Sequence, residues 1–206
     1  MRSRRDLKRV NALMANGRIV AAELRRLLPA GARSIVEIGA GDGSFALGLA
    51  RALAPALPGA RFMLLDRQPL VDAQALAGFA RHGWCASALA CDVFDWLAGP
   101  VERHDAIVAN LFLHHFEPAA LARLLAGVAA RTDCFVACEP RRGAFALAGS
   151  HLLGLVGCND VTRHDAVVSV RAGFAGNEIG SLWPPGWQLS EAPRGAFSHC
   201  FAARRR

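Results

Sequence analysis

Apolar positions along this chain follow two alternating spacings. Short, mostly apolar runs typical of buried strands recur along the sequence, and segments with apolar residues at helical spacing lie between them. We expect strands at 34–38, 61–66, 84–90, 105–110 and 133–138. We expect helices near 44–54, 69–81, 93–98 and 118–130. Strands separated by helices predict βαβ units and therefore an α/β fold with a mostly parallel, doubly wound sheet.

The two ends of the chain depart from this alternation. Residues 6–28 carry apolar side chains mostly at helical spacing and predict one or two amphipathic helices, with a break at Asn16-Gly17. Near the other end, the strand-like runs WQLSEA and FSHCFAA flank Pro193-Arg194-Gly195 and predict an antiparallel hairpin. We find no internal repeat and no low-complexity linker, so we expect one domain over residues 1–206.

The composition narrows the class of protein. A chain of 206 residues that is 53% hydrophobic and 20% charged is typical of a globular domain. The net charge of +7 is spread along the sequence, and we find no basic, aromatic-rich module, so we expect no nucleic-acid partner. No apolar run is long enough for a membrane span, and no signal core follows the basic N-terminus. The scattered cysteines form no CxxC pair and no metal-ligand cluster, so we expect reduced thiols, no metal and a cytoplasmic protein.

The stretch SIVEIGAGDGSF, residues 34–45, contains a glycine turn between a strand and a helix. Such a turn lets the backbone approach a ligand closely, and the following helix directs free N–H groups toward it. The fingerprint of a dinucleotide-dependent oxidoreductase would place a glycine at position 44, where this chain has Ser44. Glu37 would repel a pyrophosphate but suits a ligand with an ammonium group. These two residues argue against a dinucleotide.

Polar residues also follow the next strands, and in open α/β sheets ligands bind at the carboxyl ends of the strands. Asp66, followed by Arg67, suits a ribose diol, because a carboxylate accepts two hydrogen bonds. Asp92, followed by Val93, can accept a hydrogen bond from the exocyclic amine of adenine. With the ammonium site at Glu37, these features predict S-adenosylmethionine as the cofactor and S-adenosylhomocysteine as its product.

In these motifs the chain resembles the class I S-adenosylmethionine-dependent methyltransferases, in particular the small-molecule group that includes quinone-biosynthesis enzymes. The resemblance covers roughly residues 33–140 and the C-terminal hairpin, and its first motif is VEIGAGDGSF. It implies a Rossmann-like seven-stranded sheet in the order 3-2-1-4-5-7-6 with the last strand antiparallel. The implied cofactor contacts come from Glu37, Gly39, Ala40, Gly41, Asp66, Asp92, Val93, Asn110 and Leu111.

The methyl acceptor is argued mainly by exclusion. The chain lacks the Asn/Asp-Pro-Pro-aromatic sequence that usually accompanies methylation of a nucleobase amino group. A hydrophobic small molecule with a phenolic, quinol or polyketide-like hydroxyl fits best, and C- or N-methylation, a protein acceptor and a non-catalytic partner subunit remain alternatives. Candidate general bases are His114 and His115, in NLFLHHF, with His164 as the rival.

Residues 143–183 are more than one crossover helix requires. A lid over an apolar substrate and two ordinary packing helices explain this segment equally well. The expected division is an N-terminal helical cap (1–30), a cofactor-binding core (31–142), a helical lid (143–183) and a C-terminal hairpin (184–206). The oligomeric state is left open.

Overall fold

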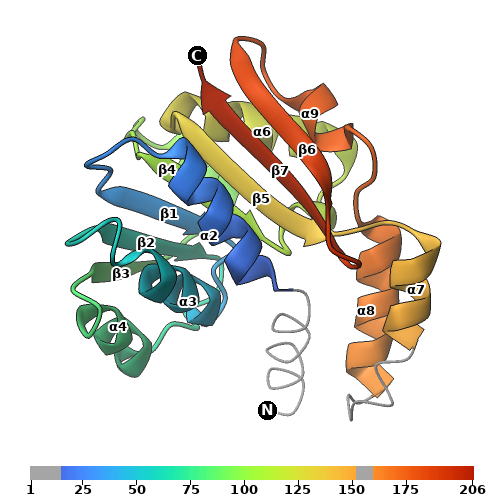
Figure 1. The fold of residues 1–206 in the computed structure, drawn as a ribbon, viewed down its shortest axis with the longest axis horizontal. Coiled ribbons are helices and arrows are strands. Elements are labelled where there is room, and N and C mark those ends of the chain that lie inside the picture. The colour runs from blue at the N-terminus through green and yellow to red at the C-terminus, as the bar shows by residue number, and fades with distance from the viewer. Residues whose placement is uncertain (1–14, 152–159) are drawn as a thin grey trace.

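A seven-stranded sheet forms the centre of the computed structural model, which describes residues 15–151 and 160–206 (Figure 1). The strand order is β3-β2-β1-β4-β5-β7-β6. Strands β1 to β5 are parallel, and β7 runs antiparallel to both β5 and β6. The strand order and the reversed strand expected from the sequence are therefore confirmed.

The strands are β1 (Ser34–Ile38), β2 (Arg61–Asp66), β3 (Cys85–Ala90), β4 (Ala106–Asn110), β5 (Cys134–Pro140), β6 (Trp187–Arg194) and β7 (Ser198–Arg205). The helices are α2 (Asn16–Leu27), α3 (Ser44–Leu53), α4 (Ala73–Ala80), α5 (Val93–Ala98), α6 (Pro118–Arg131), α7 (Ala144–His151), α8 (Asp160–Ala172) and α9 (Glu178–Leu182), with a short 3-10 helix η1 (Leu113–His115). Within the described ranges, no helix has both the length and the apolar composition of a membrane span.

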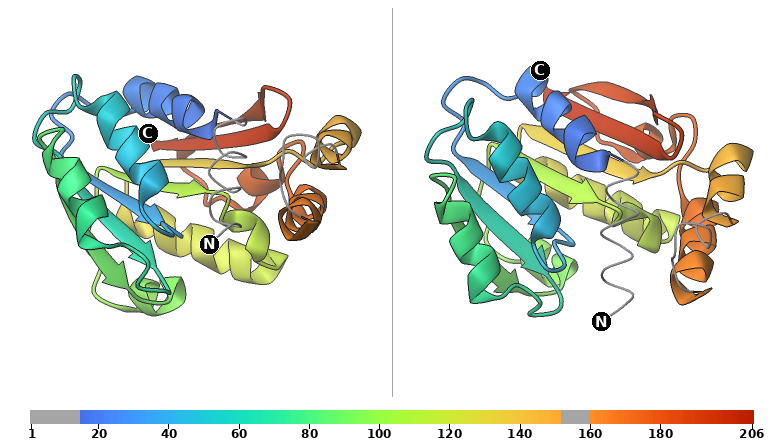
Figure 2. Two further views of the ribbon diagram at one scale, coloured as in Figure 1. Left: turned by 90° about the horizontal axis from the view of Figure 1, so that it is seen from below. Right: turned by 60° about the horizontal axis from the view of Figure 1, so that its bottom comes forward.

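Helices cover both faces of the sheet and bury one apolar core on each. Helices α2, α3 and α4 lie on one face, where Leu24, Leu49 and Phe79 contribute to the core. Helices α5, α6 and α9 lie on the other, where Leu124 and Ile179 are buried. Figure 2 shows α2 and α3 on one side of the strands and α6 on the opposite side. Successive side chains of a central strand point alternately into the two cores. The central strands therefore have nearly continuous apolar sequences.

Two predicted boundaries were wrong by a few residues. The helix expected over 69–81 begins only at Ala73, because the Asp72 carboxylate accepts a hydrogen bond from the Ala75 N–H at 2.7 Å and caps the helix there. The turn of the hairpin is formed by residues 195–197, and Pro193 lies within β6. β6 is the edge strand of the sheet, where a residue without an N–H is tolerated.

Helix α2, which lies within the predicted N-terminal cap over residues 1–30, forms a layer of the core. It packs on β5 and β7, with Val20 and Leu24 fully buried. The expected break at Asn16-Gly17 was wrong, because both residues lie in α2, which starts at Asn16 directly after Ala15 with a left-handed φ of 54°. Residues 6–14 of the predicted helix lie outside the described residues.

The predicted lid over 143–183 divides into two parts. α7 and α8 pack against each other beyond the carboxyl end of β5, and α8 also contacts η1 (Figure 1). α9 packs on α6 and β6, and Ile179 and Trp183 are buried in the core of that face. Residues 174–183 thus carry apolar side chains that cover the sheet, as the alternative of packing helices expects. A lid formed by the preceding residues stays a prediction.

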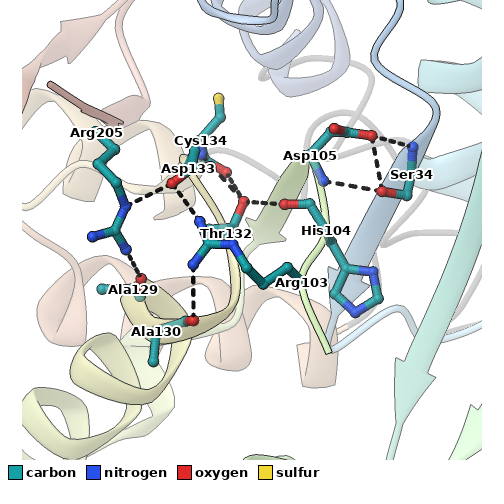
Figure 3. Close-up of polar contacts among 10 residues, drawn as sticks. All are labelled: Ser34, Arg103, His104, Asp105, Ala129, Ala130, Thr132, Asp133, Cys134 and Arg205. Carbon is teal, nitrogen blue, oxygen red and sulfur yellow. Dashed lines mark hydrogen bonds and ion pairs between the residues drawn. The ribbon is translucent and has the colours of Figure 1, made fainter. Parts of the chain in front are cut away.

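At the amino ends of the parallel strands, charged side chains form hydrogen bonds and ion pairs between neighbouring segments (Figure 3). The Asp105 carboxylate accepts hydrogen bonds from the N–H and the hydroxyl of Ser34, each at 2.9 Å. Asp133 accepts from the guanidinium groups of Arg103 and Arg205. Asp105, Asp133 and the two arginines line a cavity of about 410 Å³. The cavity lies at the edge opposite the glycine turn, so it is not the site that the sequence predicted.

Candidate cofactor and active site

The glycine turn between β1 and α3 holds three left-handed glycines. Gly39, Gly41 and Gly43 have φ of 73°, 55° and 75°, a region that other residues adopt at an energetic cost. The N–H groups of Gly39 and Ala40 both donate to the carbonyl of Leu65, at 2.9 and 3.0 Å. The turn is thus bonded to the end of β2, and it leads directly into the N-terminus of α3.

Asp66 at the end of β2 organises this turn. Its Oδ2 accepts a hydrogen bond from the Gly41 N–H at 2.8 Å, and its Oδ1 accepts from the Gln68 N–H at 2.9 Å. Each carboxylate oxygen keeps a second lone pair, so a bond from this side chain to a ribose stays a prediction. Arg67 is exposed, and within the described residues its guanidinium has no ion pair.

Glu37 is a buried acid beside the turn. Its side chain is inaccessible to solvent, and its Oε2 has no hydrogen-bond partner in the described part of the chain. Burial raises the pKa of this carboxyl well above its usual range, and the charges of Asp66 and Asp42 add to the increase, against the hydrogen bond from the Ala46 backbone. A cation at Oε2 would satisfy this oxygen and favour the ionised acid.

Asp92 caps helix α5. Its Oδ1 accepts a hydrogen bond from the Phe94 N–H at 2.8 Å, and the following residue, Val93, is buried in the core. This carboxylate therefore has a structural role at the start of α5. The adenine contact expected of Asp92 and Val93 stays a prediction.

The end of β4 lies against the glycine turn. Asn110 is the last residue of the strand, and Leu111 follows with a φ of 53°, a strained conformation for a residue other than glycine. The Leu111 N–H donates to the Cys138 carbonyl at 3.0 Å. The ring of Phe112 then covers Gly39 so closely that a Cβ on that glycine would lie 2.2 Å from the ring. The cofactor contact expected of Asn110 and Leu111 stays a prediction.

His114 forms a buried pair with Glu139, at the end of β5. Its Nδ1 lies 2.7 Å from Oε2 of Glu139, while Oε1 accepts hydrogen bonds from the N–H groups of Phe112 and Leu113 at 3.0 and 2.9 Å. One carboxylate therefore orients the imidazole and holds the segment that carries it. The other ring nitrogen, Nε2, has no hydrogen bond within the described residues.

The other two candidate histidines differ in position. The ring of His115 lies 4.1 Å from that of His114, centroid to centroid. Burial lowers the pKa of His115, and the neighbouring His114 lowers it further, against the opposing charge of Glu139. His164 is exposed on α8 and makes no hydrogen bond or ion pair within the described residues. The structure thus places His114 and His115 together and leaves His164 apart.

Two polar residues of this edge were missed from the sequence. Glu139 lies between the apolar run DCFVAC and Pro140. A charged residue at the end of a buried strand could have indicated a functional residue there. Asn16 is fully buried and donates from Nδ2 to Oδ1 of Asn110 at 2.8 Å. The sequence offered no signal for this bond, because the partners lie far apart along the chain.

Known structures share this architecture, although no protein-family model and no curated protein match the sequence. Magnesium protoporphyrin IX methyltransferase (ChlM) from Synechocystis PCC 6803, with bound S-adenosylhomocysteine, has a TM-score of 0.57 and 15% identity, covering 94% of this chain and 83% of its own. The mitomycin 7-O-methyltransferase MmcR has a TM-score of 0.61 and 21% identity, covering 96% and 54%. A putative O-methyltransferase from Nostoc punctiforme PCC 73102 has a TM-score of 0.62 and 14% identity, covering 98% and 60%.

These likenesses define the fold. The chain has the class I methyltransferase fold, with the strand order 3-2-1-4-5-7-6 and an antiparallel β7. It spans little more than half the length of several structures that it matches, such as MmcR. These likenesses show the fold alone, and the activity depends on the residues of the site.

Proposed function

We propose that this protein is an S-adenosylmethionine-dependent methyltransferase that acts on a hydrophobic small molecule and releases S-adenosylhomocysteine. The observation that carries the proposal is the Glu37 oxygen without a partner, buried beside a glycine turn at the carboxyl edge of this fold. An inaccessible carboxylate without a counter-charge is costly. A ligand with an ammonium group removes this cost, whereas a pyrophosphate increases it.

The residues of this edge fit the cofactor. Glu37 and the backbone of Gly39 to Gly41 would hold its amino-acid end, Asp66 its ribose, and Asp92 with Val93 its adenine. The bound cofactor supplies a methyl group already activated by a sulfonium. The protein's task is then mainly to align the acceptor with that methyl group, and such positioning can contribute about 7–11 kcal/mol.

An oxygen acceptor gives the His114–Glu139 pair a purpose. A phenol with a pKa near 10 is only about 0.1% ionised at pH 7. Nε2 of His114 would take the hydroxyl proton, and Glu139 would hold the ring with Nδ1 protonated and stabilise the imidazolium. A positioned base contributes about 10²–10⁴-fold, which is comparable to the handicap of the un-ionised phenol. A neutral amine acceptor needs no such base, so the pair favours O-methylation over N-methylation.

Aromatic side chains beside the pair support a hydrophobic acceptor. The rings of Phe112 and Phe116 lie 5.0 Å apart, and Phe94 contacts Phe116 edge-on at 5.7 Å. The names of two structural neighbours describe methyl transfer to magnesium protoporphyrin IX and to mitomycin, both small molecules. A phenolic, quinol or polyketide-like acceptor agrees with both observations.

Ligand binding tests the cofactor first. S-adenosylhomocysteine should raise the melting temperature, because a ligand specific to the native state adds about 2.7 kcal/mol at a concentration of about 100 times Kd. NADH should produce no shift. An unchanged melting temperature at about 1 mM S-adenosylhomocysteine would reject the cofactor. A methyl-transfer screen over phenols, quinols and polyketide-like lipids then tests the acceptor, and cofactor binding without transfer to any of them would favour a non-catalytic subunit.

A further inference from the structure

Three buried polar side chains form a hydrogen-bonded chain on the α2 face of the sheet. The Ser198 hydroxyl, on β7, donates to Oδ1 of Asn16 at 2.6 Å. Nδ2 of Asn16, at the start of α2, donates to Oδ1 of Asn110 at 2.8 Å. All three residues are buried, Ser198 and Asn16 completely. A buried polar group without a hydrogen bond lowers the stability of the fold. These hydrogen bonds therefore fix the position of α2 relative to the end of β4 and the start of β7.

The direction of these bonds determines which end of the Asn110 amide is free. Asn16 uses its oxygen to accept from Ser198, so its nitrogen faces Asn110 and requires an acceptor there. The oxygen of Asn110 takes that bond. Its amide nitrogen therefore points away from Asn16, and within the described residues this nitrogen donates no hydrogen bond.

The free amide nitrogen lies on the same face of the sheet as Glu37. Glu37 is paired in register with Val108 on the neighbouring strand β4, two residues before Asn110. Side chains two residues apart on a strand share a face, so Glu37 and Asn110 are diagonal neighbours at the carboxyl edge. One offers an oxygen without a partner and the other an N–H donor. This combination matches an α-amino-acid zwitterion, whose ammonium and carboxylate groups need an acceptor and a donor side by side.

We propose that Asn16 is a positioning residue: it holds the Asn110 amide so that its nitrogen donates to the carboxylate at the amino-acid end of the cofactor. This inference rests on the proposed function and extends it to helix α2. Asn16 acts only through Asn110, and Ser198 sets the orientation of Asn16.

The test compares two adenosine ligands by calorimetry. S-adenosylhomocysteine carries the amino-acid group, and 5′-methylthioadenosine lacks it. Asn110→Ala should weaken S-adenosylhomocysteine binding about 10-fold or more, as expected for a lost hydrogen bond to a charged group. Asn16→Ala should weaken it about 3–10-fold, and the double variant should bind no more weakly than Asn110→Ala alone. Both variants should keep the wild-type affinity for 5′-methylthioadenosine.

Glu23→Ala is the matched control. Glu23 also anchors α2, through an ion pair with Arg194 of β6, and among the described residues it has no hydrogen bond to Asn110. It should lower the melting temperature and leave both affinities unchanged. Should Asn16→Ala not fold, Ser198→Ala removes the first bond of the chain with a smaller change of volume and should show the same selective loss.

Three results would overturn the proposal: equal losses for the two ligands, no loss in Asn16→Ala, or the same selective loss in Glu23→Ala. Wild-type protein that binds neither ligand would reject the proposed cofactor. Wild-type binding of both ligands with unselective variants would reject only the role of Asn16.

Discussion

Nδ1 of His114 lies 2.7 Å from Oε2 of Glu139, and both side chains are almost completely shielded from solvent. The same carboxylate accepts the N–H groups of Phe112 and Leu113. The end of β5 thereby fixes both the loop after β4 and the imidazole on it. This arrangement is what a general base needs, because its ring must keep one tautomer and one orientation.

Replacing the histidines tests which one is the base. His114→Ala should lower turnover about 10²–10⁴-fold with S-adenosylhomocysteine affinity nearly unchanged, since the base acts on the acceptor and not on the cofactor. His115→Ala should have a smaller effect, because this ring lacks a carboxylate partner. Normal turnover in both variants would show that neither His114 nor His115 is the base. A large loss in His164→Ala alone would identify His164 on α8 as the base. Turnover and affinity are measured in parallel for all three.

Glu139→Gln tests the orienting carboxylate. The amide oxygen can still accept from the N–H groups of Phe112 and Leu113, but the amide nitrogen then faces Nδ1 of His114. The ring would have to accept at Nδ1 and carry its proton on Nε2, where it can no longer act as a base. We expect a loss of turnover comparable to that of His114→Ala, with a nearly unchanged melting temperature. Full activity would show that Glu139 only anchors the loop.

Gly39 and Gly41 provide a matched pair of glycine substitutions. Gly39→Ala combines a left-handed residue with a clash against the Phe112 ring, so it should cost about 2–5 kcal/mol of stability. Gly41→Ala meets no atom within 4 Å and should cost only about 1–2 kcal/mol, from its positive φ. Chemical denaturation measures both. Similar losses in the two variants would show that the Phe112 contact is unimportant.

Asp66→Ala should weaken cofactor binding by about 1.5–3 kcal/mol, as expected for bonds to a charged group. Part of the loss would be indirect, because the variant also releases the N–H groups of Gly41 and Gln68. Asp66→Asn separates the two contributions, since its single oxygen can still hold Gly41. Unchanged affinity in Asp66→Ala would place the ribose elsewhere.

The helices and strands were predictable because short stretches of the sequence determine them. Runs such as RFMLLD and DCFVAC are long enough and apolar enough to be buried strands, and the segments between them have helical spacing. The strand order came from the resemblance carried by VEIGAGDGSF. Boundaries failed where one side chain decides them, as where Asp72 caps α4.

The site was predictable only where it is local in sequence. The glycine turn follows β1 directly, Asp66 ends β2 and Asp92 lies two residues beyond β3, so the sheet brings them to one edge. The His114–Glu139 and Asn16–Asn110 contacts join residues from separate elements, and their geometry depends on how those elements pack. The spacing of residues along one sequence does not predict such contacts.

The buried acid Glu37 makes stability depend on pH. Its pKa is raised in the folded protein above an ordinary value near 4.5, so the native state retains a proton that the unfolded chain has lost. The free energy of unfolding is therefore highest at a pH below the pKa that Glu37 has in the unfolded chain. It falls as the pH rises toward the pKa of Glu37 in the folded protein, by up to about 1.4 kcal/mol per pH unit. Glu37→Gln removes this titration. Between pH 5 and pH 8 the variant should lose less stability than the wild type, as measured by urea denaturation in the absence of ligand.

The same carboxyl should release its proton when the cofactor binds. An ammonium group at Oε2 favours the ionised acid, so S-adenosylhomocysteine binding near pH 7 should release up to one proton in the wild type and none in Glu37→Gln. Calorimetry in buffers of different ionisation enthalpy counts that proton, and 5′-methylthioadenosine, which has no ammonium group, should release none from either protein. Equal proton release from the wild type and Glu37→Gln would show that the ammonium group binds elsewhere, and the cofactor would then have to be oriented without the buried acid.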